Sequence, residues 1–167
     1  MTAREQLAAI GSLDELLTGE GIEYWLFGGW AVDFHAGGIT RPHEDVDIAV
    51  WTKDVDRLAT LLEDSGWRHK PDKEEDGYTA FERAGVRLEV AFLDRSDDGE
   101  IFTPLHGGGH GEWPDGAFGH DVARLGRARA RLVSLDALKV DKSAARTDPA
   151  VSAKDAADVA TLARFGV

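Results

Sequence analysis

The spacing of apolar residues predicts the elements of the first half of the chain. Five aliphatic residues recur at intervals of three or four before Gly19, which predicts an amphipathic helix: Leu7, Ile10, Leu13, Leu16 and Leu17. Residues 24–27 are typical of a short strand, and residues 30–36 of a helical turn after Gly28-Gly29. The alternation of Val46, Ile48 and Val50 with polar or small residues has the two-residue period of a half-buried strand. Leu58, Leu61 and Leu62 mark a further helix over residues 54–65.

The second half contains a hairpin, a long irregular stretch and two helices. Residues 78–83 and 86–93 flank Ala84-Gly85 and are typical of two hairpin strands. Residues 94–126 are rich in Gly, Asp and His, and we expect little secondary structure there. Helices are predicted over residues 135–145 and 152–165, and Ser152 with Asp155 has the spacing of a capping box that opens the last one.

This order of elements predicts the α/β (α+β) class: a small mixed β-sheet with flanking helices, followed by a short C-terminal helical pair. A length of 167 residues suits one domain with its own core. We expect that domain to have a core over residues 1–93, a loop-rich part over 94–133 and C-terminal helices over 134–167.

The charge balance changes the expected partners. Asp and Glu number 31 and Lys and Arg 19, which gives a net charge of −12. This charge repels nucleic acid and anionic membranes and suits a cationic small molecule, although acidic surfaces also serve solubility alone. Cysteine is absent, no apolar run approaches the length of a membrane span, and the first residues lack a secretory pattern. We therefore expect a cytoplasmic protein.

Three carboxylates carry the strongest chemical signal. Asp45 and Asp47 share one face of their predicted strand, and Glu89 lies opposite the apolar face of the second hairpin strand. If these strands are neighbours, the three side chains meet and can hold two Mg²⁺ ions, as in nucleotidyl transfer. The alternatives are that the aspartates line a solvated strand face and that Glu89 pairs with Arg83 or Arg87.

Gly28 and Gly29 end one predicted strand and open a helix. Without side chains they allow backbone N–H groups to approach a phosphate at a helix N-terminus. A glycine pair alone indicates only a turn. The order of strand, Gly-Gly, short helix and Asp-x-Asp strand is a rarer combination.

Residues 24–33 (YWLFGGWAVD) and 41–48 (RPHEDVDI) resemble the DNA polymerase β-like nucleotidyltransferase superfamily. Within it the chain is most similar to the small antibiotic nucleotidyltransferases that adenylylate lincosamides and aminoglycosides. The resemblance covers about residues 24–93 and weakens afterwards. It implies a phosphate-contacting turn at Gly28 and Gly29, Mg²⁺ ligands at Asp45 and Asp47, and a base or third metal ligand at Glu89.

The resemblance also implies cationic residues near the nucleotide. Arg41 and His43 match family positions close to it, with the alternative that local carboxylates satisfy both side chains. Lys139 and Lys142 lie on a helix similar to one whose lysine reaches the triphosphate; Lys142 is the preferred candidate, and a solvated helix face is the alternative. Two features depart from the family: the third carboxylate is often Asp, and the C-terminal part is short, which makes a homodimer plausible.

Two further features of residues 94–126 carry less weight. His106 and His110 have the spacing of a helical metal pair, but Gly107-Gly108-Gly109 disfavours a helix and we expect a flexible loop. Trp113 has two alternative roles, stacking on a sugar or drug ring and anchoring the loop on the core.

The predicted function is transfer of a nucleoside monophosphate from a Mg²⁺-bound nucleoside triphosphate, ATP by preference, to a hydroxyl of a lincosamide or aminoglycoside. Six acidic residues of the loop-rich part would attract a polycationic acceptor: Asp94, Asp97, Asp98, Glu100, Glu112 and Asp115. The alternative enzyme is a toxin-type or regulatory nucleotidyltransferase that modifies RNA or protein, and the net charge disfavours RNA. A nucleotide-binding pseudoenzyme would require that one of the three carboxylates be replaced, and none is.

Overall fold

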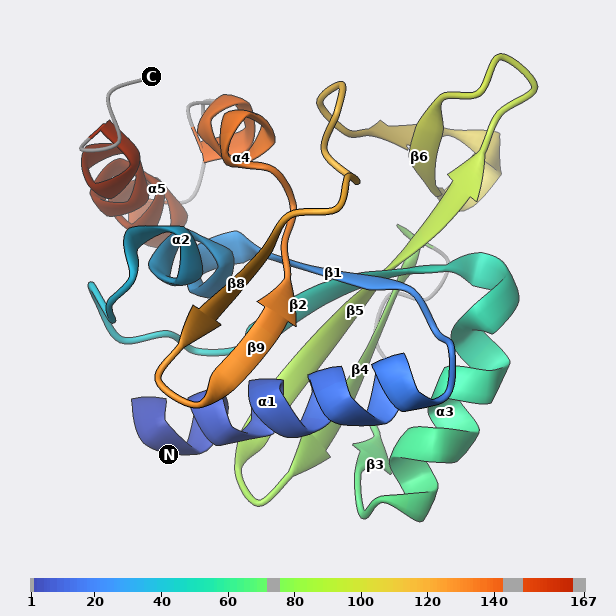
Figure 1. Ribbon diagram of the computed structural model, residues 1–167. Coiled ribbons are helices and arrows are strands. Elements are labelled where there is room, and N and C mark those ends of the chain that lie inside the picture. Colours follow the sequence, from blue (N-terminus) through green and yellow to red (C-terminus); the bar gives the residue numbers. More distant parts are fainter. Residues whose placement is uncertain (1, 72–75, 143–148, 164–167) are drawn as a thin grey trace.

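The computed structural model describes residues 2–71, 76–142 and 149–163, without the side chains of residues 141–142 and 149–153. Its centre is a mixed sheet whose main path has the order β1-β2-β5-β4-β3 (Figure 1). The bounds of these strands are β1 Tyr24–Phe27, β2 Val46–Trp51, β3 Arg68–His69, β4 Tyr78–Arg83 and β5 Val86–Arg95. β2 and β5 are parallel, and the other pairs on this path are antiparallel. The predicted mixed sheet is confirmed.

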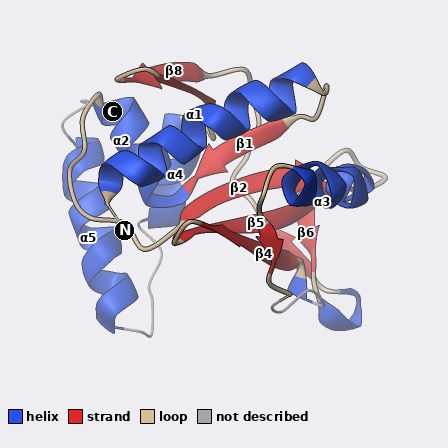
Figure 2. Cartoon of the chain, turned by 90° about the horizontal axis from the view of Figure 1, so that it is seen from below, coloured by secondary structure: helices blue, strands red, loops and turns tan. Residues whose placement is uncertain are grey.

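Two helices cover one face of the sheet. Figure 2 shows α1 (Ala3–Gly19) and α3 (Val55–Asp64) on the same side, and a short 3-10 turn, η1 (Thr52–Asp54), leads into α3. The Tyr24 hydroxyl donates a hydrogen bond to Asp14 of α1, which identifies the face of β1 that α1 covers. Because side chains alternate along a strand, Trp25 and Phe27 lie on the opposite face of the sheet from Tyr24.

Three more helices gather at the end of the sheet where β1 finishes. They are α2 (Gly28–Ala36), α4 (Leu135–Lys142) and α5 (Pro149–Leu162), and they lie together in both views (Figures 1 and 2). Buried apolar residues from Ala9 to Leu162 join the helices and the sheet in one cluster. Among the described residues, no helix is both long and apolar enough to cross a membrane.

The predicted hairpin is confirmed as β4 and β5. Arg83 pairs with Val86, and the two turn residues Ala84 and Gly85 have φ angles of 50° and 82°. Two positive φ angles are what a two-residue type I′ turn requires, and glycine supplies one of them without steric cost. The turn fixes the register that aligns β5 with its neighbours.

The expectation of little secondary structure over residues 94–126 was wrong. β6 (Ile101–Pro104) pairs with the end of β5, and β7 (His110–Glu112) pairs with β6 after the short turn η3 (His106–Gly108). β8 (Val122–Leu125) and β9 (Ala128–Arg131) form a separate hairpin. These strands have only three or four residues each, too few for the alternation of side chains to show in the sequence.

The last helix begins three residues earlier than predicted. α5 begins at Pro149, so Ser152 lies inside its first turn and is not the capping residue. Proline is favoured at the first helical position because its fixed φ suits a helix and its missing N–H needs no partner there. The predicted helix ends at residues 145 and 165 lie outside the described residues.

Candidate active site

Three carboxylates converge where β2 and β5 run side by side. Asp45 directly precedes β2, and Asp47 of β2 is the register partner of Glu89 of β5. One carboxylate oxygen from each of the three residues lies within 4.8 Å of the others, and all three side chains are half-buried. The predicted meeting of Asp45, Asp47 and Glu89 is therefore confirmed.

Burial and the neighbouring negative charges raise the pKa of Asp45 above its usual value. Burial is the largest cause, followed by the charges of Glu89 and Glu44. The charge of Lys154 and a hydrogen bond with Asp47 oppose the shift. This environment disfavours the ionised form of Asp45. A cation bound among these oxygens would offset the repulsion between the carboxylates and favour their ionised forms.

Glu89 also has a cationic neighbour on its own strand. Its Oε1 atom accepts a hydrogen bond of 3.2 Å from Arg87 Nε, and Arg87 lies 3.9 Å from Glu82. The sequence presented two alternatives for Glu89, pairing with Arg87 and convergence with the two aspartates. In the structure both occur together.

The glycine pair allows the surrounding side chains to come close. Gly28 begins α2 with a φ of 70°, and a Cβ atom there would collide with the carboxylate of Asp47. At Gly29 a Cβ would collide with Arg41 Nη2 and would lie 2.5 Å from His43 Nδ1. Both positions therefore require glycine, because neighbouring side chains lie too close to leave room for a Cβ atom. At Gly29 this places the N-terminus of α2 at the edge of the site.

Arg41 is held by the C-terminal helix. Its Nε and Nη2 atoms donate hydrogen bonds of 2.9 and 3.0 Å to the two carboxylate oxygens of Asp158, which is fully buried in α5. A planar guanidinium that binds a carboxylate through two parallel bonds is fixed in orientation as well as position. The Nη2 atom that faces Gly29 is thereby placed at the wall of the site.

His43 is held in a similar way by α2. Its Nε2 atom lies 2.6 Å from Asp33 Oδ2, and the other oxygen of Asp33 accepts a hydrogen bond from Thr40. Asp33 is fully buried, and the His43 ring also packs on Trp30, with 4.8 Å between ring centroids. The alternative that local carboxylates satisfy these cations applies to His43, whereas the partner of Arg41 is distant in sequence. Both side chains still lie against Gly29.

These groups surround one cavity of about 300 Å³, which we call the carboxylate cavity. Its lining consists of Gly29, Arg41, His43, Glu44, Asp45, Asp47, Glu89, Lys154 and Asp155. Lys154 Nζ lies 2.7 Å from Glu44 Oε1. Among the described side chains the lysine of the cavity is thus Lys154 of α5, whereas Lys139 is not part of the lining, and the side chain of Lys142 lies outside the description.

The sequence did not single out Asp33, Lys154 or Asp158, although all three lie in or directly behind the wall. Lys154 and Asp158 are separated by four residues and so lie on one face of α5. That spacing is the signal that could have identified them. A partner for Arg41 so far along the chain has no local signature.

The donor set fits a hard divalent cation. Carboxylate oxygens are the ligands that Mg²⁺ prefers, and within the described part of the chain this is the group of acidic side chains close enough to share an ion. Beside it, the backbone N–H groups at the start of α2 and the side chains of Arg41 and Lys154 offer donors to an anion. A site with clustered carboxylates next to anion donors can bind a metal-bound polyphosphate.

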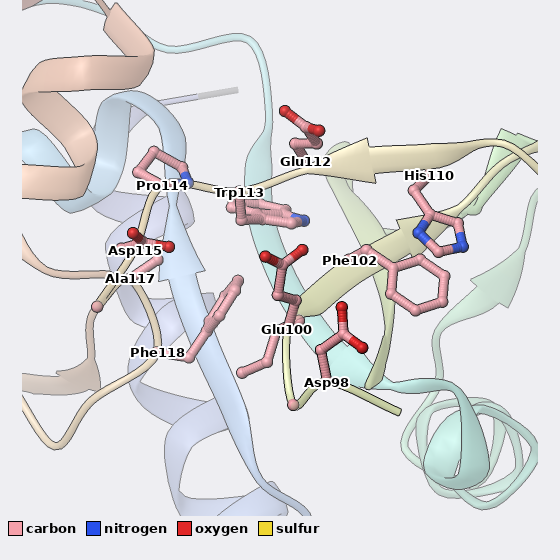
Figure 3. Close-up of a pocket in the computed structure, with 13 residues that line it drawn as sticks. Asp98, Glu100, Phe102, His110, Glu112, Trp113, Pro114, Asp115, Ala117 and Phe118 are labelled. Atoms are coloured by element: carbon pink, nitrogen blue, oxygen red, sulfur yellow. The ribbon is translucent and has the colours of Figure 1, made fainter. Parts of the chain in front are cut away.

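The loop-rich part forms a second cavity, of about 420 Å³, shown in Figure 3. Four of the six acidic residues line it: Asp98, Glu100, Glu112 and Asp115. Asp94 lines a different cavity, and Asp97 is exposed. Instead of lying in a flexible loop, His106 is in η3, and His110 in β7 stacks on Phe102 with 3.7 Å between ring centroids.

Comparison with known proteins gives consistent results. The model of the aminoglycoside-2''-adenylyltransferase family matches residues 9–162. A lincosamide resistance protein of Staphylococcus haemolyticus is 31% identical over 98 residues, an alignment that covers 53% of this chain and 55% of the relative. The chain therefore matches only about half the length of this relative.

Two solved structures share the fold along almost the whole chain. The lincomycin-bound lincosamide adenylyltransferase LnuA has a TM-score of 0.73 and 21% identity, with 98% of this chain and 97% of that chain covered. ANT(2'')-Ia in complex with adenylyl-2''-tobramycin has a TM-score of 0.76 and 20% identity, with 98% and 90% covered. The nucleotidyltransferase fold predicted from the sequence is confirmed.

Proposed function

The chain belongs to the aminoglycoside-2''-adenylyltransferase family, and on this premise we propose that it transfers AMP from ATP to a hydroxyl group of a lincosamide or aminoglycoside antibiotic. The observation that carries the proposal is the carboxylate cavity, in which Asp45, Asp47 and Glu89 meet beside Gly29. The relatives named above act on or bind antibiotics of both classes, which supports the choice of acceptor.

The reaction replaces the phosphoanhydride bond between the α- and β-phosphates of ATP with a phosphate ester bond to the acceptor. The acceptor oxygen attacks the α-phosphorus of ATP, the new O–P bond forms, and the bond from that phosphorus to the pyrophosphate oxygen breaks. Glu89 takes the hydroxyl proton, because its carboxylate is adjacent to both aspartates and is oriented by Arg87. Pyrophosphate leaves with the electron pair of the broken bond.

Asp45, Asp47 and Glu89 would hold two Mg²⁺ ions, which would lower the pKa of the acceptor hydroxyl and neutralise charge on the triphosphate. The remaining side chains orient the nucleotide. The N–H groups at the start of α2 would face the phosphates, and Arg41 and Lys154 are cations in the lining of the cavity. We assign to Lys154 the role that the resemblance implies for Lys139 or Lys142, because Lys154 lines the cavity, Lys139 does not, and the side chain of Lys142 is outside the described residues. Homodimer formation stays a prediction.

A mass-spectrometric screen tests the proposal directly. The purified chain is incubated with Mg²⁺, with each of ATP, GTP, CTP and UTP in turn, and with a panel that includes lincomycin and tobramycin. We expect an added mass of one AMP on at least one antibiotic. If no antibiotic in the panel gains a nucleotide with any of the four donors, the proposed function is wrong.

The matched control is Asp47→Asn, which keeps the volume of the side chain and removes its charge. A metal ligand supplies several kcal/mol of transition-state stabilisation, so we expect pyrophosphate release to fall by about 10³-fold or more. The thermal midpoint should stay near that of the parent. A variant with near-parental turnover would contradict the assignment of Asp47 to the metals.

A further inference from the structure

A cavity of about 310 Å³ adjoins the catalytic carboxylates on the same face of the sheet. Phe27, one of its lining residues, is the register partner of Asp47, so their side chains leave neighbouring strands on one face. Tyr78, another lining residue, lies two positions before Ala80 on β4, and Ala80 is the register partner of Glu89. Two residues along a strand correspond to about 7 Å. This cavity therefore begins one side chain away from the site of reaction.

The walls of this cavity combine aromatic rings with polar groups. They consist of Phe27, Tyr78, Thr103, Leu105, Gly111, Glu112, Trp113 and Pro114, and we call the space the Trp113 cavity. Its acidic group is the exposed side chain of Glu112. Aromatic walls suit the apolar faces of a sugar ring, and a carboxylate at the rim suits a protonated amine. A volume of this size lies at the lower end of the range for ligand pockets, about 300–1,000 Å³.

Trp113 is fixed as a rigid wall between this cavity and the acidic cavity of Figure 3. Its Nε1 atom donates a hydrogen bond of 2.9 Å to the buried Thr103 hydroxyl. Its ring packs edge-on against Phe27 and Phe118, with centroid distances of 5.1 and 4.9 Å. Figure 3 shows the carboxylates of Glu112 and Glu100 on opposite sides of the Trp113 side chain. The tryptophan anchors the loop, as one alternative stated, and it also presents a surface to a ligand.

We propose that the Trp113 cavity is the acceptor site, where a sugar ring of the antibiotic packs on Trp113 with its reacting hydroxyl toward Asp47 and Glu89. An amine of the antibiotic pairs with Glu112, and any further amines extend past Trp113 toward Asp98 and Glu100 in the acidic cavity. This inference rests on the proposed function, because it names where that reaction would hold its acceptor. It makes Trp113 and Glu112 determinants of acceptor specificity.

Direct binding of lincomycin and tobramycin, measured by calorimetry with Mg²⁺ and without nucleotide, tests this site. For Trp113→Ala we expect the acceptor dissociation constant to rise about tenfold, the size of one aromatic contact, and the KM for ATP to stay within twofold. Trp113→Phe keeps an apolar ring and should recover most of the affinity. The matched control is Trp51→Phe, which changes a tryptophan on the same sheet face outside this cavity.

Glu112→Gln removes the charge that the proposal assigns to the amine, so acceptor affinity should fall about threefold to tenfold. Asp64→Asn makes the same change in net charge at an exposed residue of α3 outside both cavities and should leave affinity unchanged. An effect seen with tobramycin alone or with lincomycin alone identifies which antibiotic class the site takes.

The proposal is overturned if neither antibiotic binds the parent chain, or if both bind Trp113→Ala as tightly as the parent. Its failure is distinguishable from failure of the proposed function. Adduct formation that does not depend on Trp113 leaves the reaction in place and removes this acceptor site. Trp113-dependent binding without any adduct leaves the binding site in place and removes the proposed reaction.

Discussion

The carboxylate cavity and the Trp113 cavity lie side by side on one face of the sheet but are built by different means. In the carboxylate cavity, buried charges hold the wall: Asp158 fixes Arg41 and Asp33 fixes His43. In the Trp113 cavity, ring packing and one hydrogen bond hold Trp113 in place. The first is drawn from the central strands, α2 and α5, and the second mainly from β6, β7 and the segment after them.

This difference implies a division of labour between chemistry and recognition. A network of paired charges tolerates little change, because removal of one partner leaves the other buried and unpaired. An apolar wall can change shape with smaller energetic consequences. Variants of the carboxylate cavity should therefore alter kcat or the KM for ATP, whereas variants of the Trp113 cavity should alter the KM for the acceptor. The following predictions test that separation.

The largest effect is expected for Glu89→Gln. An amide cannot take the acceptor proton, and general-base catalysis typically contributes 10²- to 10⁴-fold in rate, so kcat should fall by about that factor. Pre-steady-state measurement of AMP transfer, together with the dissociation constant for ATP, checks this expectation. A parallel collapse of nucleotide affinity would show that Glu89 acts chiefly as a metal ligand.

Gly29→Ala should reduce turnover by about 10²-fold. The added Cβ would push Arg41 and His43 away from the N-terminus of α2, and small displacements of positioning groups can have effects of this size. Gly38→Ala is the matched control, since its Cβ would meet nothing within 4 Å. Steady-state kinetics of both variants test the point, and equal activities would show that close approach at Gly29 is not required.

Asp158→Asn should raise the KM for ATP about tenfold with a smaller change in kcat. The amide keeps one hydrogen bond to Arg41 and loses the charge and the second acceptor, so the guanidinium is less firmly held. An exposed aspartate of α3, changed in Asp64→Asn, is the control. A raised KM for the acceptor with an unchanged KM for ATP would break the proposed separation.

The smallest effect concerns stability. Burial and the nearby carboxylates raise the pKa of Asp45, so its stabilising contribution is present below the unfolded-state pKa and is lost as the pH rises through the folded-state value. At neutral pH and without metal, Asp45→Asn should therefore raise the free energy of unfolding, and the gain should be small because solvent screens a half-buried group.

Thermal unfolding with and without Mg²⁺ measures this difference. The parent chain should gain stability on addition of Mg²⁺, and Asp45→Asn should gain much less. A metal-free variant that is less stable than the parent would show that the charge of Asp45 is already compensated within the protein.

The candidate residues that the structure brings together as expected are those whose placement depends on local pattern. Asp45 and Asp47 are two positions apart on one strand, and Gly28-Gly29 marks the turn into α2, so short-range alternation sufficed for them. Glu89 required one assumption, that β2 and β5 are neighbours, which the structure confirms. Asp158 and Lys154 depend on how α5 packs against α2, and the Trp113 cavity depends on strands too short to show alternation. The spacing of Lys154 and Asp158 places both on one face of α5, but no local pattern shows which residues that face or the Trp113 cavity would contact.

The parallel pairing of β2 with β5 has a consequence for how activity appears during folding. The two strands are separated along the chain by α3, β3 and β4, so their pairing closes a long loop and is expected to form late. Until it forms, Asp45 and Asp47 can occupy their places without Glu89. A slip of one residue in this pairing would turn Glu89 to the opposite face of the sheet. During refolding, recovery of enzymatic activity should therefore lag behind recovery of helical structure.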